Sequence, residues 1–277
     1  MKPLLFRIPV LGIPIYGFGA MLIVAVSLGL LLAVWRSRRE KLDPNLILDL
    51  SSWIIIGGLV GARLLYVMEY WGETITNARE IMHVWEGGIA FYGSVIGAAA
   101  AFFLFRVFRE FPVLATLDAI APSIALGIAM GRIGCFLNGC CYGELCPIPW
   151  LAVRFPKESP AWLAQRAQGL IARNAPWSLP IHPTQLYSAV DGLIILMLLS
   201  AYYPIRRRDG EVIGLLMLTY PITRFMVDRL RDDETGLLFG MTSAQMISIM
   251  LLGLGLVYWS LIRSRKSKLW VETKPDG

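Results

Sequence analysis

Seven long apolar runs divide the chain, and short polar stretches separate them. A hydrocarbon core about 30 Å thick is crossed by about 20 apolar residues in a helix. Runs of this length predict membrane spans near residues 13–35, 46–68, 88–108, 113–134, 186–203, 211–230 and 242–262. Each span should be helical, because no water is present in lipid to satisfy free backbone groups. The pattern predicts an all-α polytopic membrane protein, with a single membrane domain over residues 1–277.

The composition supports this interpretation. Hydrophobic residues make up 56% of the chain and charged residues 17%, whereas a soluble domain carries about 25% charged residues. The net charge is +6, and the Lys and Arg residues gather in short loops between spans, as they do where they set membrane orientation. We therefore interpret the positive charge as a topology signal, and we expect no nucleic-acid partner.

The basic loops predict the orientation of the spans. They follow the first, third, fifth and seventh spans, at residues 36–41, 106–109, 206–208 and 263–268. Loops rich in Lys and Arg stay in the cytoplasm, so the N-terminus is expected outside and the C-terminus inside.

This orientation places the longest non-helical stretch, residues 140–185, on the extracytoplasmic side. It contains Trp150, Trp162 and Trp177. Tryptophan is enriched where a protein meets lipid headgroups, so we expect this segment to have interfacial character.

Charged side chains inside spans are costly and often mark function. Arg63, Arg132 and Arg224 each lie late in an outward-running span, so we expect them to meet in the outer half of the membrane. Arginine binds phosphate in a fork geometry, and a phospholipid headgroup is the phosphate found at that depth. In the alternative interpretation these arginines reach towards water, or pair internally with Asp118 or Asp228.

Other polar residues are predicted near the same outer ends of the spans. Tyr16, Glu86, Tyr92 and His182 lie there, and all four are candidates for the same site. His182 precedes Pro183 at the start of a helix, where we expect it to fix the turn by hydrogen bonding. A role as a base is the less favoured alternative for this imidazole.

Glycines are concentrated in a polar motif at residues 131–143, which reads Gly-Arg-Ile-Gly-Cys-Phe-Leu-Asn-Gly-Cys-Cys-Tyr-Gly. Such glycines allow the backbone to turn or to approach a ligand closely. Pairs of glycines four residues apart, at 127–131, 57–61 and 93–97, also predict small-residue seams between helices.

All four cysteines of the chain fall in this region, as Cys135, Cys140, Cys141 and Cys146. Their spacing is not a usual zinc pattern, so we expect packing residues or a disulfide to Cys146 and no metal. A metal site remains the less favoured alternative.

Six stretches of the chain form a recognisable set of motifs. They are Ile-Tyr-Gly, Gly-Ala-Arg, the entry to the third span, the glycine-rich motif, a His-Pro-Thr-Gln-Leu-Tyr box and an Arg-Phe-x-x-Asp-x-x-Arg segment, at 15–17, 61–63, 85–93, 131–139, 182–187 and 224–231. In these motifs and their order the chain resembles the prolipoprotein diacylglyceryl transferase family over most of its length. The resemblance implies a bacterial inner-membrane enzyme that needs no cofactor.

The resemblance also implies the reaction and its residues. The family transfers the diacylglyceryl group of phosphatidylglycerol to the lipobox cysteine in the signal peptide of a preprolipoprotein, which forms a thioether and releases glycerol phosphate. Arg132 and Arg224 are then the phosphate-binding and catalytic residues. Tyr92 and Asp228 are further catalytic candidates, and the supporting lipid-binding positions are Tyr16, Arg63, Glu86, Asn138, Gly143 and Arg231.

The chain also departs from the family pattern at several positions. Tyr92 stands where many members have histidine, and tyrosine is a weaker base at neutral pH, so the identity of the base is open. Cys135 and Cys140 replace asparagine and glutamate of the usual motif. Two alternatives to this function are a membrane transporter and a diverged thiol- or metal-dependent membrane enzyme.

Overall fold

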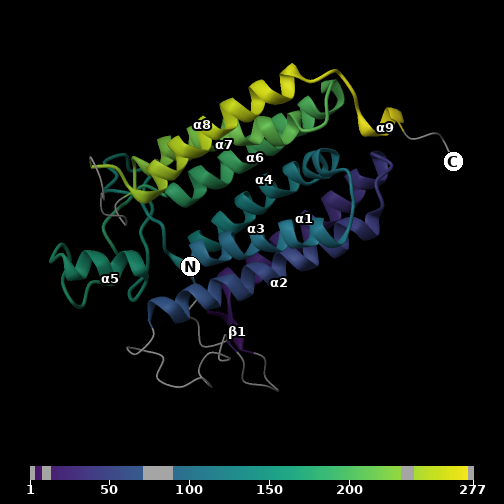
Figure 1. Ribbon diagram of the computed structural model, residues 1–277. Coiled ribbons are helices and arrows are strands. Elements are labelled where there is room, and N and C mark those ends of the chain that lie inside the picture. Colours follow the sequence, from purple (N-terminus) through teal and green to yellow (C-terminus); the bar gives the residue numbers. More distant parts are fainter. Residues whose placement is uncertain (1–3, 8–13, 71–89, 232–239, 274–277) are drawn as a thin grey trace. The chain divides into compact units, whose positions relative to one another are not determined.

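The structure is a computed structural model in which helices dominate (Figure 1). It describes residues 4–7, 14–70, 90–231 and 240–273, with side chains from residue 17 onward except those of 91, 92, 272 and 273. The helices are α1 (Gly17–Arg39), α2 (Pro44–Glu69), α3 (Phe91–Phe108), α4 (Val113–Asn138), α5 (Pro160–Ala167), α6 (Thr184–Tyr202), the short 3₁₀ helix η3 (Tyr203–Ile205), α7 (Glu211–Asp228), α8 (Ser243–Ser264) and α9 (Trp270–Thr273). Two short strands, β1 (Leu4–Arg7) and β2 (Pro14–Tyr16), pair in antiparallel fashion before α1.

Each of the predicted spans corresponds to one long helix. Among the described residues, α1, α2, α4, α6 extended by η3, and α8 are long and apolar enough to cross a bilayer. The apolar part of α3 is shorter, at Gly93–Phe108, and α7 carries Glu211, Arg224 and Asp228 within its 18 residues. The helical fold is confirmed, whereas membrane crossing by α3 and α7 stays a prediction.

The chain forms two compact units, which are described separately. The smaller unit is Val34–Thr116, and the larger unit combines Met1–Ala33 with Leu117–Gly277.

In the smaller unit, α2 and α3 pack backbone against backbone. A Cβ atom on Gly57 would lie 2.8 Å from the carbonyl oxygen of Gly97, and one on Gly61 would lie 2.7 Å from the Cα of Gly97. A side chain does not fit at these separations, so the two helices approach this closely only through glycine. The seams predicted at 57–61 and 93–97 are confirmed as one shared interface.

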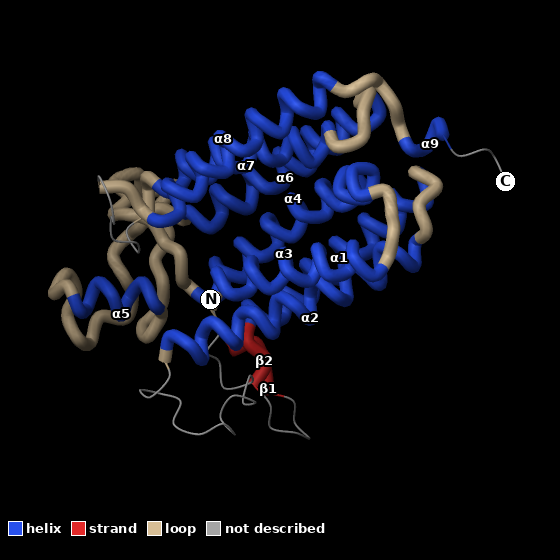
Figure 2. Tube along the Cα trace, viewed as in Figure 1, coloured by secondary structure: helices blue, strands red, loops and turns tan. Residues whose placement is uncertain are grey.

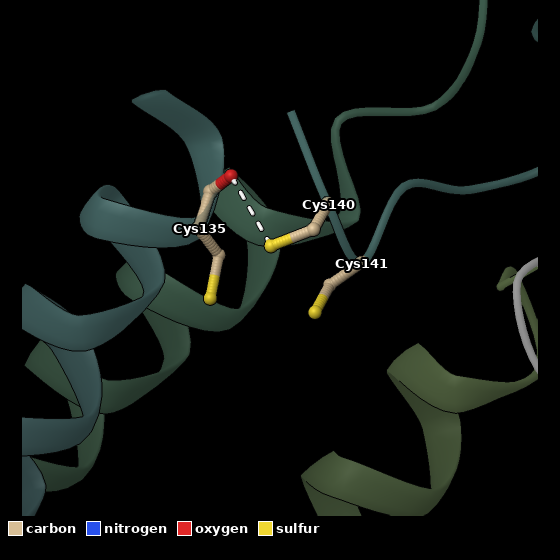
Figure 3. A group of neighbouring side chains, drawn as sticks. All are labelled: Cys135, Cys140 and Cys141. Carbon is tan, nitrogen blue, oxygen red and sulfur yellow. Dashed lines mark hydrogen bonds between the residues drawn. The ribbon is translucent and has the colours of Figure 1, made fainter. Parts of the chain in front are cut away.

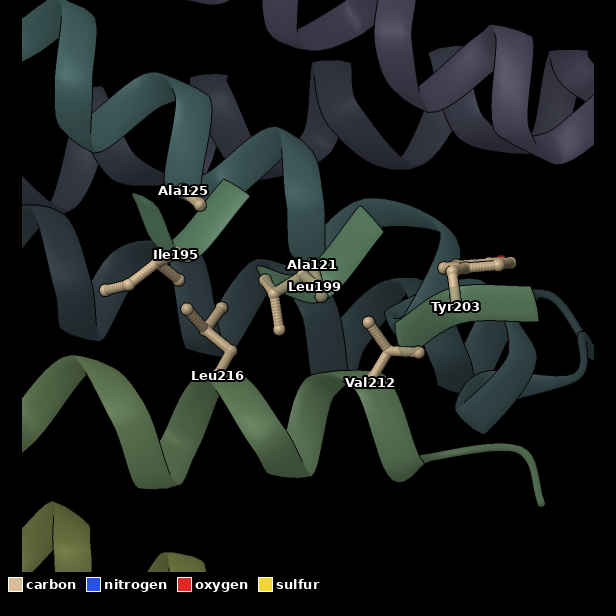
Figure 4. Packing of buried hydrophobic residues seen from close by; sticks show 7 residues of the cluster. All are labelled: Ala121, Ala125, Ile195, Leu199, Tyr203, Val212 and Leu216. Carbon is tan, nitrogen blue, oxygen red and sulfur yellow. The ribbon is translucent and has the colours of Figure 1, made fainter. Parts of the chain in front are cut away.

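In the larger unit, α4, α6 and α7 share a hydrophobic core (Figure 4). Its buried residues are Ala121, Ala125, Ile195, Leu199, Tyr203, Val212 and Leu216. Gly192 of α6 lies close to α4, because a Cβ atom there would be 3.0 Å from the backbone nitrogen of Ala129. The alanines of α4 and the glycine of α6 therefore bring these two helices together.

The seam predicted at Gly127 and Gly131 is wrong. A Cβ atom at either position would meet no atom of the described chain within 4 Å. Successive residues of an α-helix turn by about 100°, so Gly127 lies on nearly the opposite side of α4 from Ala125 and Ala129. The face of α4 that packs against α6 is thus formed by alanine, and the two glycines do not pack against any described residue.

Asp118 has a structural role at the start of α7. Its buried carboxylate accepts hydrogen bonds from the backbone N–H groups of Gly210 (2.8 Å), Val212 (3.0 Å) and Ile213 (2.9 Å). The first N–H groups of a helix have no partner within the helix, and a carboxylate there satisfies them and complements the helix dipole. Arg206 lies 3.7 Å from the same carboxylate, so Asp118 pairs with neither Arg132 nor Arg224.

Between α4 and α6 the chain forms an ordered segment, which we call the head segment (residues 139–183; Figure 2). Its own small core contains Tyr142, Phe155, Ala161 and Ile181. Trp162 of α5 is fully buried, and its Nε1 donates to the carbonyl oxygen of Ala175 at 2.9 Å.

The predicted interfacial role is therefore wrong for Trp162, because a fully enclosed ring reaches no headgroup. Trp150 and Trp177 are 83% and 50% exposed and remain candidates for that role. The three tryptophans differ because α5 turns one of them into the head segment's own core.

Candidate active site

The end of α7 carries a carboxylate that holds two arginines. Asp228 is buried, and its Oδ1 lies 3.2 Å from Nη2 of Arg224 and 3.3 Å from Nη1 of Arg231. The hydroxyl of Thr242 donates to the other oxygen, Oδ2. Arg224 lies one helical turn before Asp228, so these two side chains share one face of the helix. Asp228 therefore fixes the orientation of both guanidinium groups.

Arg132 of α4 adds a further positive charge to this group. The charges of Arg132 and Arg231 both repel that of Arg224, and the described residues offer Arg132 no carboxylate partner. Nη1 of Arg224 is buried and has no hydrogen-bond partner in the described part of the chain. Asp228 thus holds Arg224 and Arg231, and Arg132 lies near enough to Arg224 for their charges to interact. We call these four residues the arginine cluster (Arg132, Arg224, Arg231 and Asp228).

The internal pairing that the alternative interpretation predicted is confirmed for Arg224, whereas phosphate binding by the arginines stays a prediction. Arg224 does pair internally with Asp228, as the alternative interpretation held. Nη1 of Arg224 is nevertheless buried without a hydrogen-bond partner among the described residues, and a buried donor without an acceptor is costly. An anion bound at this site would remove that cost.

The head segment is joined to the end of α7 through Gly143. Gly143 and Arg231 form an antiparallel bridge, and the backbone N–H of Glu144 donates to the carbonyl oxygen of Leu230 at 2.9 Å. On its other side, the N–H of Gly143 donates to the carbonyl oxygen of His182 at 3.0 Å. Gly143 thus lies between the backbone at the end of α7 and the backbone that enters α6.

Gly143→Ala is expected to lower the free energy of unfolding by about 1–3 kcal/mol, the usual cost of forcing extra atoms into a packed site. A Cβ atom there would lie 2.6 Å from the carbonyl oxygen of Leu230 and 2.8 Å from Cβ of His182. Thermal unfolding in detergent measures the effect. Gly127→Ala is the control, since it meets no neighbour and adds helix propensity, and equal unfolding midpoints for the two variants would contradict the steric account.

His182 fixes the turn that enters α6, as predicted. Its backbone N–H donates to the carbonyl oxygen of Glu144 at 2.9 Å, and its Nδ1 lies 3.0 Å from the hydroxyl of Tyr187. The next residues hold the same turn, because Thr184 Oγ1 donates to the carbonyl oxygen of Cys141 at 2.7 Å. Through these bonds the His-Pro-Thr box joins α6 to the turn that follows α4.

Three of the four cysteines meet at the end of α4 (Figure 3). The Sγ atoms of Cys135, Cys140 and Cys141 all lie within 4.8 Å of one another. Cys146 is buried apart from them, and its thiol donates to the carbonyl oxygen of Ile148 at 3.6 Å. All four are free thiols in this structure, so the disulfide to Cys146 that was one of the expected alternatives is not formed.

The Cys140 thiol has a polar environment of its own. Hydrogen bonds from the Cys135 and Cys141 thiols hold its pKa below the ordinary value, and a hydrogen bond with Asn138 acts in the same direction, whereas partial burial raises the pKa. Of the predicted site residues, Asn138 is therefore placed beside the cysteines.

The remaining predicted site residues are not placed in the cluster. Arg63 belongs to the smaller unit, where its guanidinium lies 5.4 Å from the centre of the Tyr66 ring. The side chains of Tyr16 and Tyr92, at the end of β2 and the start of α3, lie outside the described atoms, as does all of Glu86. Their roles stay predictions.

Sequence reasoning missed Thr242, which orients Asp228 from the start of α8. It also caps that helix, because its Oγ1 accepts from the N–H of Gln245 and the Gln245 side chain accepts from the N–H of Thr242. The Thr-x-x-Gln pattern of a capping box was visible in the sequence and predicts the cap, though not the contact with Asp228.

Comparison with known proteins identifies the family. Residues 3–261 match the family model described as prolipoprotein diacylglyceryl transferase. A Clostridium tetani protein named phosphatidylglycerol–prolipoprotein diacylglyceryl transferase is 33% identical over 96% of this chain and 100% of its own length. A protein of the same name from Synechococcus elongatus is 32% identical over 87% of this chain and 81% of its own. The chain therefore belongs to the prolipoprotein diacylglyceryl transferase family.

Proposed function

We propose that this protein is a membrane transferase that moves the diacylglyceryl group of phosphatidylglycerol onto the lipobox cysteine of preprolipoproteins. The observation that supports this most is the arginine cluster, in which Nη1 of Arg224 is buried without a partner among the described residues. A lipid phosphate would supply the missing acceptor, and guanidinium groups bind phosphate through strong, charge-assisted hydrogen bonds.

The reaction replaces a carbon–oxygen bond by a carbon–sulfur bond. The lipobox thiol loses its proton, the thiolate attacks the glycerol carbon that carries the phosphate, and the electron pair of the broken bond leaves with glycerol phosphate. Negative charge grows on the departing oxygen, so cations fixed beside it lower the barrier. Arg132 and Arg224 have this role, and Asp228 keeps Arg224 and Arg231 in place.

The other site residues complete the proposal. Tyr92 is proposed as a hydrogen-bond donor at the reacting groups, since its hydroxyl is a poor base at neutral pH. Lipid-binding roles are assigned to Tyr16, Arg63, Glu86, Asn138 and Gly143 on the strength of the family pattern.

We further propose seven spans, one membrane domain, an external N-terminus and a cytoplasmic C-terminus in the inner membrane. The larger unit supports this orientation, because Asp118 joins the start of α4 to the start of α7 beside the basic residues 206–208. The opposite ends of these helices carry the arginine cluster and the head segment. Catalysis then takes place at the extracytoplasmic side, where secreted substrates arrive.

A transporter is the alternative, and the geometry of Asp118 does not favour it. A transport pathway needs polar groups that are open to a cavity through both halves of the membrane. Asp118 is instead closed off by three backbone N–H groups of α7. It therefore serves as a helix cap.

The purified protein is expected to transfer label from phosphatidylglycerol with radioactive acyl chains to a synthetic lipobox peptide, and to release glycerol phosphate. The control peptide carries serine in place of the lipobox cysteine and should stay unlabelled, because an alcohol is not ionised at neutral pH. Absence of transfer by folded protein, under conditions where the Clostridium tetani relative is active, would contradict the proposal.

A further inference from the structure

The cysteines have no part in the proposed transfer reaction, yet three of them form one group. Cys135 lies in the last turns of α4, and Cys140 and Cys141 lie in the turn that follows it. Figure 3 shows the three sulfur atoms around a common space between the helix and the turn. Sequence spacing argued against a metal, but the reversal of the chain after Asn138 makes that spacing irrelevant.

The separations suit a metal ion. Zinc binds thiolate sulfur at about 2.3 Å, so two sulfur atoms on one tetrahedral zinc lie about 3.8 Å apart. The three Sγ atoms already lie within 4.8 Å of one another. Binding would therefore require the side chains to move by about one ångström or less, without a change in the backbone.

The backbone around the group is held from both sides. The amide Nε2 of Gln185 donates to the carbonyl oxygen of Cys140 at 2.7 Å, and Thr184 Oγ1 donates to that of Cys141 at 2.7 Å. Cys141 adopts a φ of +59°, a left-handed conformation that is costly for a residue with a side chain. These contacts keep the thiols near one another in the absence of a ligand, which reduces the cost of ordering them on binding.

A candidate for the fourth ligand contacts the backbone of Cys140. Gln185 is completely buried, and while its Nε2 binds Cys140, its Oε1 has no hydrogen-bond partner in the described part of the chain. A buried acceptor left without a donor is uncommon in a native fold. An amide oxygen on this residue is suited to complete a tetrahedral site.

We propose that Cys135, Cys140 and Cys141 bind one thiophilic metal ion, of which Zn²⁺ is the best match, with Gln185 as the fourth ligand. Binding forms three metal–sulfur bonds and releases three thiol protons, and no electron is transferred. Arg132 lies three residues before Cys135, about one turn away on the same face of α4. The site would fasten the turn that leads from α4 to Gly143.

The test uses the full-length protein, reduced and stripped of metal in detergent, and titrated first with Co²⁺ and then with Zn²⁺. One Co²⁺ per chain should bind with thiolate-to-cobalt charge-transfer absorption, and Zn²⁺ should displace it. In each of the variants Cys135→Ser, Cys140→Ser and Cys141→Ser, the affinity for Zn²⁺ should fall by at least about 100-fold, since each thiolate contributes a large share of the binding free energy.

Cys146→Ser is the matched control, because its thiol lies outside the group and bonds to Ile148; its affinity should equal that of the wild type. A reduced wild type that binds no stoichiometric metal would overturn the proposal, as would unchanged affinity in the three variants. Isolation of a disulfide between two of these thiols, together with failure of the reduced form to bind Zn²⁺, would assign the group to thiol pairing instead. None of these readouts depends on transferase activity.

Discussion

Arg224→Ala is expected to lower the kcat/KM of diacylglyceryl transfer by at least about 100-fold, the usual effect of removing one fixed donor from a developing negative charge. Nη1 of Arg224 is the buried donor that lacks a partner in the described chain. The fold should persist, because Asp228 keeps its contacts with Arg231 and Thr242. The measurement is transfer of labelled lipid to a lipobox peptide, with the purified variant.

Two further variants make the result specific. Arg229→Ala removes an exposed arginine one residue beyond α7, whose guanidinium lies over the ring of Phe225, and it should keep near-normal activity. Arg224→Lys should recover only part of the activity, because an ammonium group lacks the fork geometry of arginine. If Arg224→Ala and Arg229→Ala were equally active, Arg224 would have no role in transfer.

Arg132→Ala is the second change with a large expected effect, again a loss of at least about 100-fold in kcat/KM. Arg132 approaches the cluster from α4, whereas Arg224 comes from α7, and their charges repel each other. Two like charges held together in this way are stabilised when one anion binds both. The two single losses should therefore not add in the double variant, because residues that act on one group are coupled.

The control for Arg132 is Arg154→Ala, which removes an exposed charge from the head segment. It should change the rate by less than about threefold, as expected for an exposed charge that has no ion pair or hydrogen bond with the described residues. Full additivity of Arg132→Ala and Arg224→Ala in kcat/KM would show that the two residues act at separate places. Normal membrane insertion of every variant is checked by its yield in the membrane fraction.

Much of the helical framework is predictable, because an apolar run of bilayer length has few alternatives to a helix. The glycine seam between α2 and α3 is equally predictable from the sequence, since small residues four apart mark close helix contacts. The same rule failed for Gly127 and Gly131. On α4, alanine provides a surface small enough to pack against Gly192, so the glycine pattern no longer identifies the packed face.

Other features depend on contacts between distant residues, which no local pattern contains. Asp118 looked like a functional charge, yet its partners are N–H groups at residues 210–213. The sequence predicted an interfacial Trp162, but this side chain is completely buried in the structure. For the cysteines, spacing along the chain is a poor guide, because a reversal of the backbone sets the distance between sulfur atoms.

The candidate site is predictable only in part, because some of its contacts also join residues that are distant in the sequence. Orientation placed Arg132 and Arg224 at the same end of their helices, and their mutual repulsion shows that they are neighbours. The sharing of Asp228 with Arg231 and Thr242 requires knowledge of how the chain continues beyond α7. Arg63 stays a prediction, since it belongs to the smaller unit.

Equilibrium binding of phosphatidylglycerol, measured by native mass spectrometry of the detergent-solubilised protein, decides whether the arginine cluster holds a lipid phosphate. Diacylglycerol, which lacks the phosphate, serves as the reference lipid. Wild-type protein should prefer phosphatidylglycerol, and the Arg132→Ala/Arg224→Ala double variant should lose at least about 100-fold in affinity for it, since each hydrogen bond to a charged group contributes about 1.5–3 kcal/mol. Equal affinity of the wild type and the double variant for phosphatidylglycerol would contradict the account.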